Sequence, residues 1–372
     1  MNKTRKVICT VTNDLYTDQR MIRICTSLAN AGFEVVLVGR QLSSSNELIS
    51  RPFKQIRLSN WFNTGVLFYL EFNLRLWWYL GKQDFDFLTN CDADTLLSGF
   101  LTQTNSNKRK TYQWMFDAHE LFYEVPELVG KPIKQKIWKW LMAICVPKVD
   151  IAYTVTKTIS AHYEKVFKKS FSVIRNVPVL RSKEVVEPRS ENKTHQVILL
   201  YQGALNKGRC IELYIRAMHQ LNAELWLVGE GDLSASLKLM VEREGLSDKV
   251  TFHGLKSPEE LRLLTNKAVM GLNLLENLGL SYYYSLSNKT FDYMHAHLPA
   301  LASPFPEYVE LNKKFEIMLL TEPSVQNLVT NVNLLVENKD VYQRLSDNCK
   351  LAQKECNWTN EEIKLLSLYG VE

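Results

Sequence analysis

The 372-residue chain has 45 lysine and arginine residues against 40 acidic residues, so its formal net charge is +5 and its pI is near 8.6. This charge is too mildly basic to argue for a nucleic-acid partner, and 46% hydrophobic with 23% charged residues is typical of a globular protein. The length suffices for two domains with separate cores. The seven scattered cysteines form no Cys-x-x-Cys pair, which indicates free thiols in a reducing compartment and neither zinc nor disulfides.

The chain begins with a predicted strand–helix–strand unit. The strand at 7–11 follows Met-Asn-Lys-Thr-Arg-Lys, without the apolar stretch of a signal peptide, so we expect a cytoplasmic protein. A helix starts near Asp18, whose simplest role is that of N-cap, and it ends at Gly32 before a strand at 34–38. Arg20, in the first turn of this helix, could face an anionic acceptor.

The segment 61–80 contains eight aromatic residues and few charges. Its apolar stretches are too short to span a bilayer, because Glu71 and Arg75 interrupt them. Tryptophans at positions 61, 77 and 78 suit the headgroup region of a membrane, where the ring is buried and its N–H stays hydrated.

Carboxylates lie near the ends of the next two predicted strands. Asp92-Ala-Asp94 has a spacing that can bind manganese, but the residues that follow continue as a helix. We therefore predict that Asp94 is a helix cap or a first-turn acid, and we expect no metal site. Asp117-Ala-His119-Glu120 follows the strand at 112–116, a position where functional side chains collect in parallel sheets. Asp117 and Glu120 are as well suited to orienting neighbours as to chemistry.

The segment 131–148 contains five lysines and no acidic residue. Its apolar residues fall on one helical face: Ile133, Ile137, Trp140, Leu141 and Ile144. This pattern is typical of an interfacial helix on an anionic membrane surface. The alternative is a helix that packs on its own domain and exposes its lysines to solvent.

Strands and helices alternate again from residue 197, after a charged stretch at 181–195 that lacks periodicity and marks a domain boundary. The predicted strands are 197–201, 224–228 and 250–252, and a helix is predicted at 210–221. Alternation in both halves predicts an α/β protein with two doubly wound parallel-sheet domains.

Two loops of the second half favour an anionic ligand. In 201–209, Gly203 lets the backbone approach a ligand, and Lys207 and Arg209 place cations nearby, although a solvated basic turn is the alternative. Gly229-Glu230-Gly231 also joins a strand to a helix, where nucleotides bind in such sheets. A Gly-x-Gly alone would fit any tight turn.

A polar loop followed by a helix occupies the start of 281–303. Ser287 or Asn288 can cap this helix, whose free N–H groups and dipole suit a phosphate, and Lys289 adds a full charge. Asp292, one turn further, could accept hydrogen bonds from a ribose diol. An ordinary polar helix start is the alternative.

The sequence Tyr-Ser-Leu-Ser-Asn-Lys-Thr-Phe-Asp-Tyr (284–293) resembles the donor site of the group 1 (family four) retaining glycosyltransferases, and the similarity covers nearly the whole chain. The family's two glutamates, which have seven residues between them, fall on Tyr284 and Asp292. The match is closer to a bacterial surface-polysaccharide subgroup reading Tyr-Ser-Leu-Pro-Asn-Lys-x-Phe-Glu-Tyr. The chain departs from the family at Ser287, and at Ala204, where an arginine is usual.

The resemblance implies the GT-B fold, in which two Rossmann-like domains face a central cleft. It places an acceptor domain at 1–185, a nucleotide-sugar domain at 186–355, and a last helix at 356–372 that crosses back. The implied catalytic residues are His119 and Arg209. The implied donor-binding residues are Gly203, Lys207, Arg209, Gly229, Glu230, Tyr284, Asn288, Lys289 and Asp292. The implied acceptor-side residues are Asp18, Arg20 and Asp117.

The resemblance further implies a retaining, metal-independent transfer of a hexosyl-type sugar from a nucleotide diphosphate, here UDP, without any cofactor. We expect a lipid-linked or oligosaccharide acceptor and an enzyme that is peripheral on the inner face of the cell membrane. A sugar-nucleotide epimerase of GT-B fold and a catalytically silent nucleotide-sugar-binding partner protein are the alternatives. The epimerase is disfavoured because no dense cluster of carboxylates and histidines is evident in the loops of the first domain.

Overall fold

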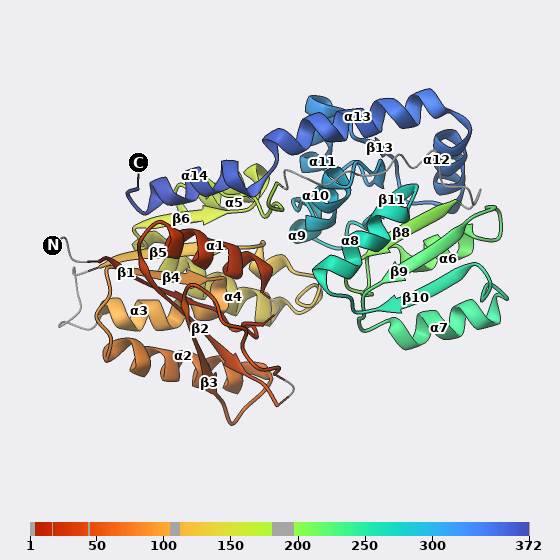
Figure 1. Ribbon diagram of the computed structural model, residues 1–372. Coiled ribbons are helices and arrows are strands. Elements are labelled where there is room, and N and C mark those ends of the chain that lie inside the picture. Colours follow the sequence, from red (N-terminus) through yellow and green to blue (C-terminus); the bar gives the residue numbers. More distant parts are fainter. Residues whose placement is uncertain (1–3, 17, 44, 105–111, 181–196, 372) are drawn as a thin grey trace. The chain divides into compact units, whose positions relative to one another are not determined.

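The computed structural model of the chain describes residues 4–16, 18–43, 45–104, 112–180 and 197–371 (Figure 1). It divides into two compact units, Met1–Asn176 with Glu361–Glu372, and Val177–Asn360. The predicted boundary at 185/186 and the predicted linker at 181–195 lie outside the described residues. The second unit extends to Asn360, a few residues beyond the predicted end at 355.

The first unit is built on a seven-stranded parallel sheet of order β3-β2-β1-β4-β5-β6-β7. The strands are β1 (Lys6–Thr10), β2 (Glu34–Gln41), β3 (Lys54–Ser59), β4 (Phe87–Cys91), β5 (Gln113–Ala118), β6 (Ile151–Thr154) and β7 (Ser172–Val173). All five residues of β4 are buried, as expected of a central strand covered on both faces. The strand order reverses between β1 and β4, which is the switch point where ligands bind in such sheets.

Helices and short 3₁₀ turns connect these strands. The helices are α1 (Gln19–Asn30), α2 (Gly65–Gly81), α3 (Leu96–Thr104), α4 (Pro132–Cys145) and α5 (Lys157–Phe167), with 3₁₀ turns at Ala93–Thr95, Phe122–Glu124 and Val146–Lys148. The last helix, α14 (Trp358–Leu368), leads to the buried Tyr369, whose hydroxyl lies 2.8 Å from Thr89 Oγ1. The segment 361–371 therefore contributes to the core of the first unit.

The second unit has a six-stranded parallel sheet of order β10-β9-β8-β11-β12-β13. The strands are β8 (Ile198–Gln202), β9 (Glu224–Val228), β10 (Val250–Gly254), β11 (Met270–Asn273), β12 (Ala300–Ala302) and β13 (Met318–Leu320). The helices are α6 (Ile211–Ala217), α7 (Ser234–Arg243), α8 (Pro258–Lys267), α9 (Leu280–Tyr283), α10 (Asn288–His295), α11 (Pro306–Phe315), α12 (Val325–Glu337) and α13 (Lys339–Glu355). Buried aliphatic residues of β8, β9, α6 and α12 form its core.

The prediction of two doubly wound parallel-sheet domains is confirmed. One helix is shorter than predicted: α6 ends at Ala217 instead of residue 221. The N–H groups of Met218 and Gln220 bond to the carbonyls of Ile215 and Ala217, so tighter i→i+3 bonds replace the α-helical pattern there. Within the described residues, the helices are all too short or too polar to cross a lipid bilayer.

Candidate functional site

Three glycines of the second unit bring the ends of neighbouring strands into contact. The N–H of Gly203 donates to the carbonyl of Val228, and the N–H of Gly229 donates to the carbonyl of Gly254, both at 2.9 Å. A Cβ atom on Gly229 would lie 2.0 Å from the carbonyl oxygen of Gly203, and its φ of +137° also favours glycine. A side chain at position 229 is thus excluded, and backbone of the two loops lies close together at this edge of the sheet.

Arg209 lies at the end of the loop that follows β8. Its guanidinium carbon lies 4.7 Å from the centre of the Tyr282 ring, and its Nε is buried without a hydrogen-bond partner. Burial acts to lower the pKa of Arg209, but Tyr282 and Tyr201 outweigh it and raise the pKa, so the side chain stays charged. Lys207, in the same loop, is exposed.

Lys289 is the second cation of this site and lies in the first turn of α10. The residue is only 6% exposed, and its Nζ is 4.1 Å from the centre of the Tyr201 ring, without a hydrogen-bond partner. A Cβ atom built on Gly203 would lie 3.6 Å from this Nζ, so the amine lies beside the glycine loop. Burial, and then the charge of Arg209, hold the pKa of Lys289 well below that of an exposed lysine.

The other donor-site candidates lie in loops and helix ends of the same unit. Asp292 accepts a 2.8 Å hydrogen bond from Gln202 Nε2 at the end of β8, and Glu230 Oε1 would lie 3.6 Å from a Cβ atom on Gly254. Ser287 is the N-cap residue of α10 but makes no side-chain capping bond, which leaves N–H groups of the first turn available. The remaining candidates lie nearby in sequence: Asn288 is exposed, and Tyr284, which ends α9, is half-buried.

In the first unit, Asp117 and Arg20 form a buried ion pair. Arg20 donates from Nε and Nη2 to the two carboxylate oxygens of Asp117, at 3.1 and 2.8 Å, and from Nη1 to the carbonyl of Ile174 at 3.0 Å. Burial raises the pKa of Asp117, but the Arg20 and His119 charges lower it to about 2. The structure thus commits the Arg20 side chain to Asp117. That either residue contacts an acceptor stays a prediction.

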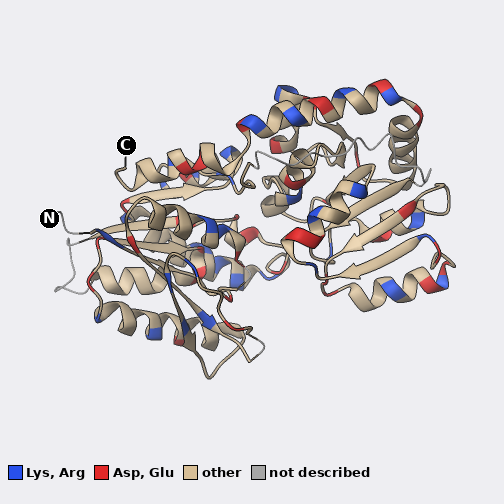
Figure 2. Cartoon of the chain, viewed as in Figure 1, with Lys and Arg blue, Asp and Glu red and all other residues tan. Residues whose placement is uncertain are grey.

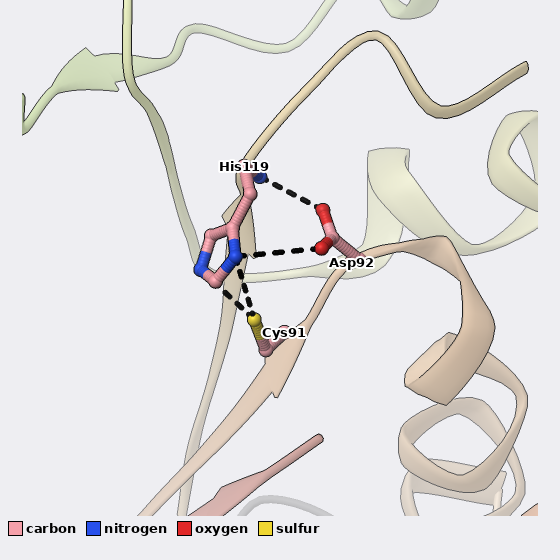
Figure 3. A group of neighbouring side chains, drawn as sticks. All are labelled: Cys91, Asp92 and His119. Atoms are coloured by element: carbon pink, nitrogen blue, oxygen red, sulfur yellow. Dashed lines mark hydrogen bonds and ion pairs between the residues drawn. The ribbon is translucent and has the colours of Figure 1, made fainter. Parts of the chain in front are cut away.

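His119, which directly follows β5, lies beside Cys91 at the end of β4 and Asp92 just after it (Figure 3), and also contacts Asp117 within β5. The His119 ring Nε2 lies 3.1 Å from Asp117 Oδ2 and 2.9 Å from the Cys91 thiol sulfur, and the ring Nδ1 lies 3.4 Å from Asp92 Oδ2. The backbone N–H of His119 donates to Asp92 Oδ1 at 2.8 Å. Burial acts to lower the pKa of His119, but the carboxylates of Asp117 and Asp92 raise it to about 9. The raised pKa favours the imidazolium form of His119 at neutral pH, in which both ring nitrogens donate hydrogen bonds.

Two predictions about acidic residues of the first unit are confirmed. Asp18 is the N-cap of α1 and accepts a 3.1 Å bond from the N–H of Met21. Asp94 lies in the first turn of the 3₁₀ segment that precedes α3, and its carboxylate is hydrogen-bonded to the Thr12 hydroxyl. Burial and the charge of Asp92 raise the pKa of Asp94 to about 7.

Cys91, Asp92 and His119 are the group of described residues that could hold a metal ion, since each offers one ligand atom within 4.8 Å of the others. Metal ligands must be deprotonated. Here the imidazole is protonated and burial raises the pKa of the Cys91 thiol, so both groups would have to release a proton first.

Comparisons with known proteins define the fold first. The chain is similar to sucrose-phosphate synthase from Thermosynechococcus elongatus at a TM-score of 0.79 and 19% identity, over 98% of each chain. It is also similar to HepE from Anabaena in complex with UDP and glucose (TM-score 0.77, 12% identity, over 99% of this chain and 100% of that one). A third similar structure is WaaG, a glycosyltransferase involved in lipopolysaccharide biosynthesis (TM-score 0.72, 13% identity, over 98% of this chain and 99% of that one). The chain has the two-domain, Rossmann-like GT-B fold.

The family comparison concerns the second unit. The model of the glycosyl transferases group 1 family matches residues 182–352, which contain every candidate donor-binding residue. Comparison with curated proteins finds no significant match. The partial family match and the shared fold together support the group 1 glycosyltransferase family for this chain.

Sequence reasoning missed several members of both sites. Cys91, which contacts His119, carries no local signal because it reads as one more buried thiol of a strand. Tyr201 and Gln202, which contact Lys289 and Asp292, could have been found from their position, since the last residues of a parallel strand lie at the ligand-binding edge of the sheet.

Proposed function

We propose that the protein is a retaining, metal-independent glycosyltransferase that moves a hexosyl-type sugar from UDP to a lipid-linked saccharide in surface-polysaccharide biosynthesis. The observation that carries the proposal is the pair of cations, the half-buried Arg209 and the buried Lys289, in the same unit as the Gly203, Gly229 and Gly254 loops, with Lys289 beside Gly203. The family match over 182–352 and the UDP named for HepE support the choice of donor. The lipopolysaccharide role named for WaaG supports the choice of acceptor.

The proposed mechanism depends on the leaving group. A nucleotide diphosphate needs no protein nucleophile to depart, but the charge that develops on it must be stabilised. Arg209, Lys289 and the N–H groups that begin α10 would provide that stabilisation. His119, an imidazolium held by Asp117 and Asp92, would donate to an oxygen of the transferred sugar.

The proposed donor is tested by thermal unfolding with a panel of nucleotide sugars, followed by turnover assays. A ligand that binds only the folded protein raises the unfolding midpoint. We expect a UDP-sugar to raise it and to be consumed when a saccharide acceptor is present. Binding without consumption in the presence of a membrane extract would instead favour the silent partner protein.

One observation favours the epimerase as a second candidate. Epimerisation needs acid–base groups around the sugar, and the sequence shows no dense cluster of them. The structure nevertheless gathers Cys91, Asp92, Asp117 and His119 into contacts of 2.9 to 3.4 Å. The two candidates differ in their products, so NMR of UDP-sugars incubated without acceptor separates them. An epimerised UDP-sugar would identify the second candidate.

The proposed membrane face combines α2 and α4. Its apolar members are Trp61, Val66, Leu70, Trp78, Ile133, Ile137 and Trp140, which are all exposed, and its cations are Lys134, Lys136 and Lys139. The ring centres of Tyr69 on α2 and Trp138 on α4 lie 5.0 Å apart, so the two helices are in contact. Glu71 and Arg75 are the charged residues of α2, which is tan over most of its length in Figure 2. On α4, Ile133, Ile137 and Trp140 face solvent, which disfavours the alternative of an apolar stripe packed on the domain.

Trp61 is the most exposed aromatic residue of this face, at 84%. The carboxylate of Glu71 accepts hydrogen bonds from the backbone N–H groups of Trp61 and Phe62 at 2.9 to 3.0 Å. Arg75 bonds to the same carboxylate and lies over the Trp61 ring, 4.7 Å from its centre. The protein thus holds a large apolar ring in water, an arrangement suited to insertion among headgroups.

Sedimentation with anionic liposomes tests the membrane face. Each lysine near such a surface contributes about 1 kcal/mol, so a Lys134, Lys136 and Lys139 to Glu triple variant should bind much more weakly than the wild type. A control triple variant, Lys267, Lys339 and Lys354 to Glu, changes the net charge equally on the second unit and should bind as the wild type does. Equal sedimentation of all three proteins, or of none, would favour a soluble acceptor.

A further inference from the structure

The environment of Lys289 is unusual for a lysine. The residue is 6% exposed, its Nζ has no hydrogen-bond partner, and the Nζ lies over the Tyr201 ring, 4.1 Å from its centre. A buried ammonium without a partner is costly, so such a group loses its proton more readily than an exposed one. The side chain is nevertheless placed at the glycine-lined edge where a diphosphate would bind.

The charged and titratable groups around Lys289 do not balance the positive charge that its ammonium form would carry. From the loop before α6, Arg209 adds a second positive charge. Cys210, at the start of α6, has its thiol pKa raised by burial to about 12 and is neutral at physiological pH. Asp292, on α10 itself, favours the ammonium, but its carboxylate already accepts a bond from Gln202. Burial and Arg209 outweigh it, and the pKa of Lys289 is held low.

We propose that donor binding is coupled to proton uptake at Lys289, which is the neutral amine in the empty site and becomes the ammonium when a diphosphate arrives. The inference rests on the proposed function, because it takes the donor to be a nucleotide diphosphate. The proton comes from solvent: the amine and one proton give the ammonium, and no other bond changes. When the nucleotide leaves, the proton returns to solvent and the empty site again avoids two adjacent buried charges.

Proton uptake makes donor affinity depend on pH. Above the lowered pKa of Lys289, the dissociation constant should rise by up to about tenfold per pH unit, because one proton must be taken up for each ligand bound. Arginine stays protonated throughout. Lys289→Arg should therefore keep the charge and lose the pH dependence.

Isothermal titration calorimetry counts these protons directly. UDP-glucose, with ADP-glucose and GDP-mannose in parallel, is titrated at pH 8 into protein in Tris and in HEPES, whose heats of ionisation differ. A nucleotide sugar is chosen because its diphosphate has no terminal phosphate group, whose pKa of about 6 would add protons of its own to the count. We expect the wild type to take up as much as about one proton per donor. Lys289→Arg should bind without uptake, Lys289→Met should bind weakly without uptake, and Lys354→Met, at an exposed position of α13 outside the candidate donor site, should retain uptake.

Each outcome has a separate meaning, provided that circular dichroism shows the variants folded. Binding by the wild type without proton uptake would overturn the inference and leave the proposed donor standing. Uptake that persists in Lys289→Arg would assign the proton to another group and overturn the inference as well. Failure of every nucleotide sugar to bind the wild type would instead contradict the proposed function, and the inference with it.

Discussion

The two candidate sites differ in how their buried charges are compensated. In the first unit, Arg20 and His119 both bond to Asp117, and Asp92 holds the other side of the imidazolium ring. In the second unit, Arg209 and Lys289 lie together, with buried nitrogens that have no hydrogen-bond partner. The folded chain thus completes one electrostatic network by itself and leaves the other incomplete.

Under the proposed function, this difference distinguishes a first-unit site whose charges are already paired from a second-unit site whose cations would be paired by the ligand. Breaking a paired buried charge costs stability, because the partner is left uncompensated. Removing a buried charge that has no partner relieves strain, and its cost appears only when the ligand binds. Stability and activity should therefore respond oppositely in the two units.

The largest expected effect is on stability, from Asp117→Ala. The substitution leaves the Arg20 guanidinium buried and unpaired, so the free energy of unfolding should fall by about 3–5 kcal/mol, measured by urea denaturation. Asp18→Ala, which removes only the cap of α1, should cost about 1 kcal/mol. If the two variants lost equal stability, the ion pair would not be the central support of this site.

Arg209→Ala, in the second unit, should lower activity much more than stability. Turnover should fall about 100-fold or more, as when a transition-state charge contact is lost, and donor binding should weaken too. Lys207→Ala, in the same loop but exposed, should have a much smaller effect on steady-state kinetics. Near-normal turnover by a folded Arg209→Ala variant would remove this residue from the site.

His119→Ala should lower transfer by about tenfold, the value of one charged hydrogen bond, while affinity for UDP is unchanged. Equal losses of turnover and UDP affinity would indicate a folding role instead.

Because the pKa of His119 is raised from 6.5 to about 9, its charge stabilises the fold fully below pH 6.5 and ceases to do so as the pH rises through 9. The stability difference between wild type and variant should shrink over that range.

Lys289→Met should stabilise the protein by about 1 kcal/mol and raise its thermal midpoint, because a buried amine beside Arg209 is replaced by an apolar chain of similar length. The same variant should bind the donor more weakly. A loss of stability would show that Lys289 supports the fold and is not a buried amine that lacks compensating contacts.

Excess chelator should have the smallest effect, and activity should need no added manganese or magnesium. Asp94 is a first-turn acid, and the group of Cys91, Asp92 and His119 would have to release two protons to bind a metal ion. Loss of activity with EDTA and recovery with manganese would place a metal ion at that group.

The sequence was sufficient for features that depend on local pattern. The alternation of strands and helices predicted both sheets, and the loop sequences predicted that Gly203 and Gly229 follow strands and that Lys289 lies at the start of a helix. The sequence could not predict which residues far apart in the chain pair with each other. Asp117 is 97 residues from Arg20, and neither residue type indicates the other. The isolation of Lys289 was equally hidden, because it depends on which groups three separate elements place around the amine.

The central claim is that the incomplete charge network of the second unit is a diphosphate site, and thermal unfolding with matched ligands tests it most directly. The diphosphates of uridine, guanosine and adenosine are each compared with the parent nucleoside, using the wild type and the Arg209→Ala, Lys289→Met double variant. We predict that at least the uridine diphosphate raises the wild-type midpoint, that uridine raises it far less, and that the double variant does not distinguish the two. Equal shifts by nucleoside and diphosphate in the wild type, or an unchanged diphosphate effect in the double variant, would contradict the claim.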